Sequence, residues 1–235
     1  MKVLVACEES QTVCKAFRYL GHEAYSCDLQ DCSGGHPEWH IKQSVLPLLN
    51  GDCIFATEDG LWHEICGKWD LIIAHPPCTY LTLTGNRWFD AVKYGYDAQK
   101  RWDNRCIAIC FFLAIAYADC DRIVIENPIG VMSRYFRKPD QIVQPWQFAT
   151  SEEEKTVKST CFWLKGVKPL KPFHKEKPEL AYHQWTTPDG KVKRQSLWYY
   201  NTRCLPHEQR AKAASKTFSG IAKAMAEQWG GENNG

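Results

Sequence analysis

A cysteine and a glutamate each follow directly after a short apolar run. Cys78 ends the stretch Ala74-His75-Pro76-Pro77-Cys78, and Glu126 opens the stretch Glu126-Asn127-Pro128. A thiolate is a strong nucleophile, and a nearby carboxyl group can hold or deliver a proton. The two prolines fix a rigid turn, which aims the thiol instead of leaving it on a flexible loop. The pair therefore predicts covalent catalysis by Cys78 with assistance from Glu126.

The surrounding sequence predicts the elements that must position these two side chains. Apolar runs at 3–6, 24–27, 70–74 and 122–125 are typical of buried parallel strands, and residues 11–20 have helical spacing. This order predicts an α/β fold with a doubly wound sheet, in which ligands bind at the carboxyl ends of the strands. Cys78 and Glu126 would then lie at one edge of that sheet.

Three further elements follow from the same patterns. Two short strands around Glu58-Asp59-Gly60 predict a hairpin outside the sheet. The segment 97–118 predicts a long helix buried against the sheet. The alanine-rich segment 221–229 predicts a closing helix.

In order and spacing these motifs resemble the DNA cytosine-5 methyltransferase family, and in particular its compact members, which are often carried by phages. The family's nucleophile lies in Pro-Cys after an apolar strand, like Pro77-Cys78, and its acid lies in Glu-Asn-Val or a close variant, like Glu126-Asn127-Pro128. The resemblance implies a Rossmann-like methyltransferase sheet that transfers a methyl group from S-adenosylmethionine to C5 of cytosine in DNA. There the thiolate adds at C6, which activates C5, while a carboxylic acid hydrogen-bonds to N3.

The resemblance also implies where the cofactor binds. The expected contacts lie after the first three predicted strands, at the nucleophile turn and before the last helix: Ala6, Cys7, Glu8, Ser10, Asp28 as the ribose-binding acid, Ser44 near the adenine, Pro76, Thr217 and Phe218. The first loop lacks the glycines of the family, which let the cofactor approach the backbone. The small residue Ser10 takes their place.

Three residues are expected to contact the substrate. Lys158 takes the place of a Gln-x-Arg-x-Arg strand of the family, and Asn127 neighbours the acid. Arg87 lies on the loop that, in the family, closes over a base flipped out of the duplex.

Charge and pattern divide the chain unevenly. We expect a catalytic domain formed by residues 1–130 and 205–230, and a small basic appendage of residues 131–204 that faces the substrate. From Lys155 to Arg210 there are 12 Lys and Arg residues against 4 Asp and Glu residues. This excess predicts a phosphate-bearing partner, although a solvated surface would show the same excess.

Other classes of protein fit the composition less well. The 235 residues contain no apolar run long enough to cross a bilayer and start directly with a strand-like segment, so we expect a cytoplasmic protein. The 12 cysteines include no Cys-x-x-Cys pair, which predicts free core thiols and no metal site.

Three alternatives remain open at this stage. The same chemistry could act on a free cytosine nucleotide, for which a small appendage would suffice. The chain could be an inactive DNA-binding relative, given its altered first loop. Methylation of an exocyclic amine uses a related Pro-Pro-aromatic motif, but Cys78 and Glu126 argue against it.

Overall fold

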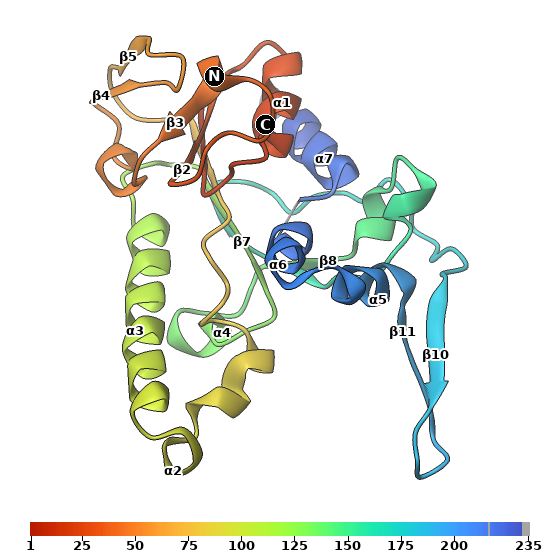
Figure 1. Ribbon diagram of the computed structural model, residues 1–235. Coiled ribbons are helices and arrows are strands. Elements are labelled where there is room, and N and C mark those ends of the chain that lie inside the picture. The colour runs from red at the N-terminus through yellow and green to blue at the C-terminus, as the bar shows by residue number, and fades with distance from the viewer. Residues whose placement is uncertain (216, 232–235) are drawn as a thin grey trace.

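A seven-stranded sheet runs through the centre of the computed structural model, which describes residues 1–215 and 217–231 (Figure 1). Its strand order is β3-β2-β1-β6-β7-β9-β8. The strands are β1 (Lys2–Ala6), β2 (Glu23–Asp28), β3 (His40–Lys42), β6 (Leu71–Ala74), β7 (Ile123–Pro128), β8 (Gln141–Val143) and β9 (Thr160–Lys165).

The sheet is mostly parallel. The five strands from β3 to β7 run in the same direction, whereas β9 is antiparallel to both of its neighbours. The chain builds outward from β1 through β2 to β3 and then crosses to β6 and β7 on the other side of β1. This reversal between β1 and β6 is the position at which ligands bind in open α/β sheets. The predicted α/β class is confirmed, and the architecture is compatible with a doubly wound sheet.

Helices cover both faces of the sheet (Figure 1). Alternate residues of the central strands divide between two cores, so that Leu4 and Ile72 lie on one face while Val5 and Ile73 lie on the other. On the second face pack α1 (Thr12–Tyr19) and α7 (Ser219–Gly230), and against the first packs α3 (Tyr96–Ala116). All four of these strand side chains are fully buried, as expected of strands covered on both faces.

The long helix α3 is less buried than its sequence predicts. A single stripe of Ala98, Arg105, Phe112 and Ile115 is buried, while Ile107 is 66% exposed. The sheet and the loop before α3 cover one side of this helix, and residues on the opposite side, such as Ile107, are left exposed. The prediction that the cysteines are core thiols is therefore wrong for Cys106 and Cys110, which are free but exposed.

Two hairpins lie outside the central sheet. The first pairs β4 (Cys53–Ala56) with β5 (Trp62–Ile65), as predicted. The second pairs β10 (Tyr182–Thr186) with β11 (Val192–Ser196) and leads directly into α5 (Leu197–Cys204).

The expected boundary of the appendage differs from the structure. Strands β8 and β9 belong to the central sheet although they fall inside residues 131–204. The apolar run Cys161-Phe162-Trp163-Leu164 pairs with the edge of β7 and is buried there, apart from the partly exposed Leu164. Of the expected appendage, only residues 166–204 follow the last strand of the central sheet.

Short helical segments connect the larger elements. They are η1 (Pro37–Trp39), η2 (Leu46–Leu48), η3 (Leu83–Phe89), α2 (Ala91–Tyr94), α4 (Met132–Tyr135), η4 (Pro145–Phe148), η5 (Glu152–Glu154) and α6 (His207–Ser215).

The buried carboxylate of Glu154 attaches α7 to the rest of the chain. It accepts hydrogen bonds from the Thr150 amide and hydroxyl at 2.8 and 2.9 Å, from the Ser219 hydroxyl at 2.7 Å and from the Gly220 amide at 2.9 Å. The amides at the start of α7 have no partner within the helix, and the Gly220 amide finds one in Glu154.

The structure also bears on membrane insertion. Across the described residues, every helix is too short or too polar to span a bilayer.

Candidate active site

His75, directly after β6, faces Glu126 in the second half of β7. The two strands are parallel, with Ala74 opposite Ile125, so His75 lies beside Glu126. The His75 Nδ1 atom lies 3.2 Å from the Glu126 Oε2 atom, and their side chains are only 9% and 14% exposed. An ionised carboxylate can only accept a hydrogen bond, so Nδ1–H donates to it.

Hydrogen bonds to two backbone carbonyls hold the turn after β6 against the end of β7. The Asn127 Nδ2 atom donates to the Pro76 carbonyl at 2.7 Å, and the Val131 amide donates to the Leu81 carbonyl at 2.8 Å. Gly130 is needed for the second contact, because a Cβ atom there would lie 2.2 Å from the Leu81 carbonyl oxygen. Asn127 is buried and its side chain helps to position the two strand ends, while its expected contact with a substrate stays a prediction.

The Cys78 thiol is half-buried on a turn of fixed shape. The Cys78 carbonyl accepts hydrogen bonds from the amides of Leu81 and Thr82 at 2.9 and 3.1 Å. Burial and the Glu126 carboxylate raise the pKa of the Cys78 thiol, and the charge of Lys158 opposes them. Cys78 is therefore a thiol at neutral pH and must lose a proton before it can attack.

Lys158 lies two residues before Thr160, which pairs with Pro128 at the end of β7. Its positive charge acts on Cys78 and also on Glu126. The Lys158 ammonium lies 5.9 Å from the Trp198 ring centre and 5.7 Å from the Phe218 ring centre. The structure thus brings three predicted residues, Cys78, Glu126 and Lys158, to one place.

The resemblance implies that Glu126 is a protonated carboxylic acid, but its surroundings in the structure favour the ionised carboxylate. Burial alone would raise the pKa of the Glu126 carboxyl, but the His75 hydrogen bond and the charge of Lys158 outweigh it and hold that pKa below its usual value. Glu126 is therefore a carboxylate in the free protein. It can accept a proton before it donates one.

Sequence reasoning missed His75. The signal was present in the sequence. His75 directly follows one apolar run and Glu126 directly follows another, so in neighbouring parallel strands the two residues lie side by side. Among the described residues the buried His75 Nε2 atom has no hydrogen-bond partner. This second ring nitrogen is a further polar group at the site.

The loop after β1 keeps a tight turn without glycine. Cys7 has a φ of 60° and Gln11 a φ of 57°, a left-handed conformation that glycine adopts at lower cost. The Cys7 amide donates to the Cys27 carbonyl at 2.7 Å, and the Ala6 carbonyl accepts from the His75 amide at 2.9 Å. Burial raises the pKa of the Cys7 thiol, and the nearby Asp28 carboxylate raises it further.

Glu8 is turned into the protein, which corrects its expected role in cofactor binding. Its carboxylate accepts hydrogen bonds from the Val13 and Cys14 amides at 2.7 and 3.1 Å, and it is 4% exposed. These amides begin α1, whose N-cap residue Gln11 makes no capping bond with its own side chain. Glu8 therefore serves as the cap of α1.

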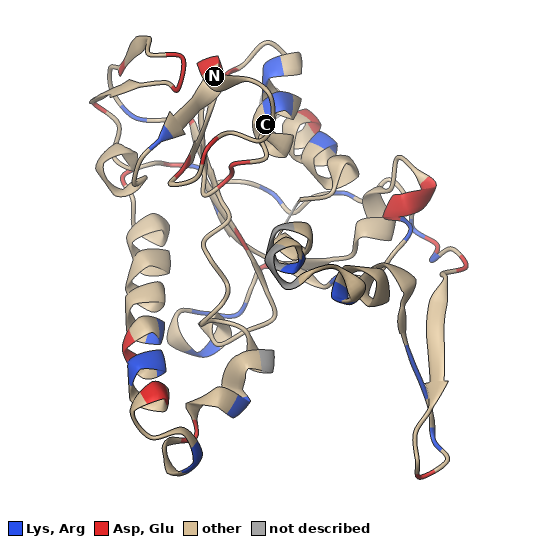
Figure 2. Ribbon diagram, viewed as in Figure 1, with Lys and Arg blue, Asp and Glu red and all other residues tan. Residues whose placement is uncertain are grey.

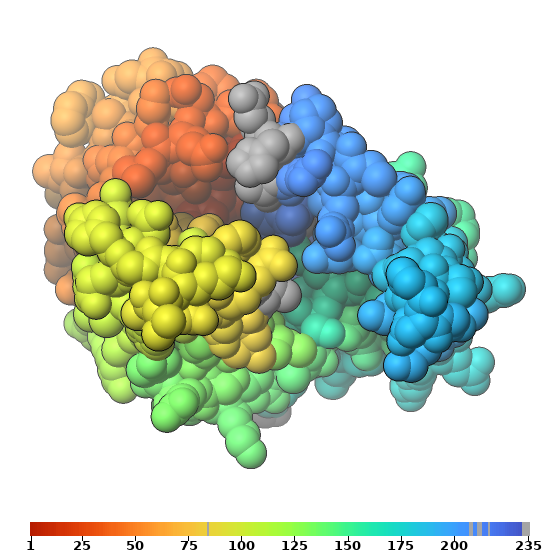
Figure 3. Space-filling view, turned by 60° about the horizontal axis from the view of Figure 1, so that its bottom comes forward, coloured from red at the N-terminus to blue at the C-terminus, as the bar shows by residue number. Residues whose placement is uncertain are grey.

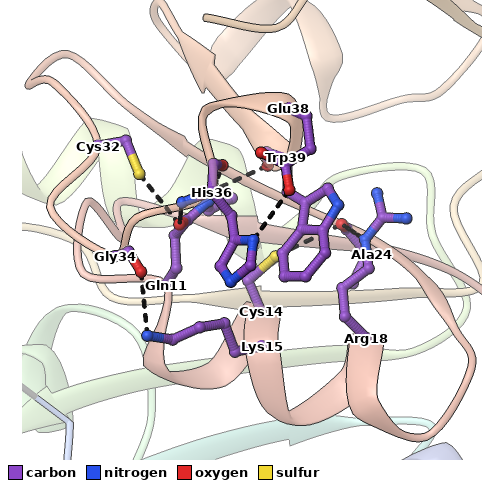
Figure 4. A network of polar contacts seen from close by, with 11 residues as sticks. Gln11, Cys14, Lys15, Arg18, Ala24, Cys32, Gly34, His36, Glu38 and Trp39 are labelled. Carbon is purple, nitrogen blue, oxygen red and sulfur yellow. Dashed lines mark hydrogen bonds and ion pairs between the residues drawn. The ribbon is translucent and has the colours of Figure 1, made fainter. Parts of the chain in front are cut away.

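Gln11 instead connects this loop to the segment after β2, as Figure 4 shows. The fully buried Gln11 amide donates to the His36 carbonyl at 2.8 Å and accepts from the His36 amide at 3.0 Å. The Cys32 thiol also donates to it at 3.0 Å. The ring of His36 stacks on that of Trp39, with their centres 3.8 Å apart.

Four of the other expected cofactor residues lie at or after the ends of β1, β2, β3 and β6. Asp28 ends β2 and accepts a hydrogen bond from the Gln30 amide at 2.9 Å. The Ser10 hydroxyl lies 3.2 Å from that of Thr12, and Pro76 is buried beside β7. Ser44 is exposed and accepts a long hydrogen bond of 3.4 Å from the Leu46 amide.

Thr217 and Phe218 line a groove of about 890 Å³ between α1 and α7. Thr12 and Trp198 line it as well. The volume is within the range of small-molecule sites. The groove thus begins beside Ser10, through its contact with Thr12, and reaches the rings around Lys158.

Arg87 lies away from the contacts described above. It is exposed on η3, with its guanidinium 4.8 Å from the ring centre of Trp88. Its loop is held from α3 by Arg105, which donates to the Tyr80 carbonyl and to the Asn86 side chain, each at 2.7 Å. Figure 3 shows the surface hollowed between this yellow loop and the blue segment of α5 and α6.

The comparisons with known proteins leave the site to be judged by its geometry. In the described part of the chain no three His, Cys, Asp or Glu residues are grouped so that they could hold a metal ion. No protein-family model matches the chain, and no curated protein matches its sequence.

Proposed function

We propose that the chain is a cytosine-C5 methyltransferase that takes its methyl group from S-adenosylmethionine and acts on DNA, with Cys78 as nucleophile. The single observation that carries this proposal is that Cys78 after β6, Glu126 in β7 and Lys158 before β9 lie near one another. A thiol, a carboxylate and a cation at one strand edge suit attack on a ring that must be protonated as it is attacked.

The site has a route for the proton of the thiol. The Glu126 carboxylate can accept that proton and hand it to N3 of cytosine as the sulfur adds to C6. The electron pair of the C5–C6 double bond then becomes available at C5 and would take the methyl group, while the bond between that methyl group and its sulfur breaks and leaves its electron pair on the sulfur. Afterwards water takes the proton on C5, and the electron pair of that C–H bond restores the C5–C6 double bond as the C6–S bond breaks. The proton on N3 returns through Glu126 to the released Cys78 sulfur.

Lys158 and His75 would act on Glu126 in different ways. The charge of Lys158 favours the ionised forms of both Cys78 and Glu126. The hydrogen bond from His75 holds one carboxylate oxygen, so that the other oxygen can face the ring. His75 would thus be a positioning residue for Glu126.

The residues at the reversal point fit S-adenosylmethionine. The cofactor would supply an electrophilic methyl group on a positively charged sulfur. Asp28 offers a carboxylate at the end of β2, where a ribose is held in such sheets. The left-handed turn at Cys7 keeps the loop close to β2 despite the missing glycine. Ser10, Pro76, Thr217 and Phe218 would complete the contacts, in a Rossmann-like methyltransferase sheet.

A direct test is to incubate the protein with duplex DNA and S-adenosylmethionine carrying a labelled methyl group. The DNA is then digested to nucleosides and analysed by mass spectrometry, with dCMP offered in a parallel reaction. The proposal expects labelled 5-methylcytosine from DNA and none from the Cys78→Ala variant. Label on dCMP alone would show that the substrate is a free nucleotide and not DNA. Label on the exocyclic amine would refute the proposed chemistry.

A further inference from the structure

The β10–β11 hairpin projects from the body as a narrow two-stranded ribbon (Figure 1). Most of its residues are exposed, and both of its faces are largely open to solvent. Isolated two-stranded ribbons have marginal stability in water, so an exposed one needs a support or a partner. Its base has a support, since the ring of His183 stacks on that of Tyr200 in α5 at 3.6 Å.

The ribbon is connected to the site through α5. Ser196, at the end of β11, caps α5 by accepting a hydrogen bond from the Tyr199 amide at 3.3 Å. Two residues after Ser196, Trp198 contacts Lys158. One continuous segment therefore carries both the hairpin and a wall of the candidate active site.

The two faces of the ribbon differ in what they present. His183 and Trp185 alternate with Gln184, so they lie on the face that contacts α5. On the opposite face Gln184 lies directly across from Arg194, and both are exposed. The Arg194 guanidinium lies 5.0 Å from the ring centre of Tyr182, which shares that face.

The charge of the ribbon suits a polyanion. The ribbon and its turn carry three cations, Lys191, Lys193 and Arg194, and one acid, Asp189, which pairs with Lys191 at the turn. Figure 2 shows the positive residues along β11 and the acid at the tip. Phosphates of a nucleic acid attract such a surface without regard to sequence.

We infer that this hairpin enters the major groove of duplex DNA and reads its sequence through Gln184 and Arg194. The inference rests on the proposed function for its choice of DNA. A β-ribbon fits the major groove, where arginine binds guanine and glutamine binds adenine with two hydrogen bonds each. Five-residue strands span about 17 Å, which is enough to cross a groove about 12 Å wide.

Selection from a pool of duplexes with a randomised centre tests the inference, with the full chain and no cofactor. The parent should enrich a short sequence. Arg194→Lys keeps the charge but loses the paired hydrogen bonds, so discrimination against a single changed base should fall roughly 5- to 150-fold. In Gln184→Ala, discrimination against a changed base at a neighbouring position should fall by a similar factor. Arg134→Lys, an exposed change on α4, should keep the preference of the parent.

Affinity for an unrelated duplex, and its dependence on salt, should be the same for Arg194→Lys and the parent. An unchanged preference in both hairpin variants would overturn the inference, as would a parent that binds no DNA or shows no preference. Covalent trapping of 5-fluorocytosine DNA by Cys78 separates the two proposals. A parent that selects a sequence but traps no DNA contradicts the proposed chemistry alone, whereas trapping with an unchanged preference in the variants contradicts the hairpin's role alone.

Discussion

The His75 Nδ1 atom lies 3.2 Å from the Glu126 Oε2 atom, and both side chains are almost fully buried. Burial by itself raises the pKa of Glu126, and the His75 hydrogen bond is the strongest of the influences that lower it. The ionised state of Glu126 therefore depends on its neighbour in β6. The proposed proton route from Cys78 starts from that state.

The first prediction concerns the pH dependence of His75→Ala. Without the hydrogen bond the pKa of Glu126 rises, so the carboxylate becomes protonated at a higher pH than in the parent. The acid limb of kcat/KM should move to higher pH, and kcat/KM at neutral pH should fall about 10- to 100-fold. His75→Asn, whose amide can still donate, should recover part of the shift. An acid limb that stays in place in His75→Ala would contradict the role of His75.

A second prediction concerns Lys158. In Lys158→Met the pKa values of both Cys78 and Glu126 rise, because the charge that lowers them is gone. Alkylation of Cys78 by iodoacetamide, followed by peptide mass spectrometry, should then need a higher pH. Lys155→Met removes an exposed charge that pairs with Glu152 and should leave the alkylation profile unchanged. Equal profiles for the two variants would show that Lys158 has no influence on the thiol.

Gly130 gives a third prediction, about the contact between the two strand ends. In Gly130→Ala the new methyl group meets the Leu81 carbonyl, so the turn that carries Cys78 must shift. Overpacking of this kind costs about 1–3 kcal/mol. Turnover should fall more than stability alone explains, because a displaced nucleophile loses rate steeply.

The matched control is Gly60→Ala, in the β4–β5 turn, where nothing lies within 4 Å of the new Cβ atom. It should cost about 1–2 kcal/mol from its positive φ and leave the turnover of the folded protein intact. Urea unfolding and initial rates on the same samples distinguish the two variants. Full activity in folded Gly130→Ala would refute the positioning role of this contact.

The fourth prediction concerns stability and Glu154. Although burial raises the pKa of Glu154, its hydrogen bonds from Thr150, Gly220 and Ser219 lower that pKa below the usual value. Glu154→Gln should destabilise the protein by about 1–3 kcal/mol at pH 7. Because the pKa is lower in the folded state, this contribution is complete above the unfolded value of about 4.3. It is lost as the pH falls through the folded value.

Urea unfolding from pH 7 down to pH 3 measures this contribution. The exposed neighbour Glu153 supplies the control, and Glu153→Gln should stay within about 0.5 kcal/mol of the parent. A difference between Glu154→Gln and the parent that grows on acidification would contradict the assignment.

The meeting of Cys78 with Glu126 could be predicted because it depends on two strong signals. Continuous apolar runs mark buried parallel strands, and the ends of such strands share one edge of the sheet. The burial of Glu8 could not be predicted. It caps α1 from three residues before the N-cap position, and ordinary capping patterns do not describe that spacing.

The limits of the appendage could not be predicted from the sequence, for a different reason. Thr160–Lys165 has the length and apolar character of a strand, but the sequence does not say which edge it joins. Pairing with β7 depends on long-range contacts, because the edge of β7 offers unpaired backbone groups to a segment far away in the sequence. The exposure of Ile107 on α3 is likewise decided by how much surface the rest of the chain covers.

Covalent trapping tests the central claim most directly. Duplex DNA containing 5-fluorocytosine is incubated with the protein and S-adenosylmethionine, and the product is analysed by intact mass and peptide mapping. Because fluorine at C5 cannot leave as a proton does, the C6–S bond persists after methyl transfer. The account predicts an adduct of protein and methylated DNA joined at Cys78 and lost in Cys78→Ala. An adduct that persists in Cys78→Ala, or no adduct with the parent protein, would contradict it.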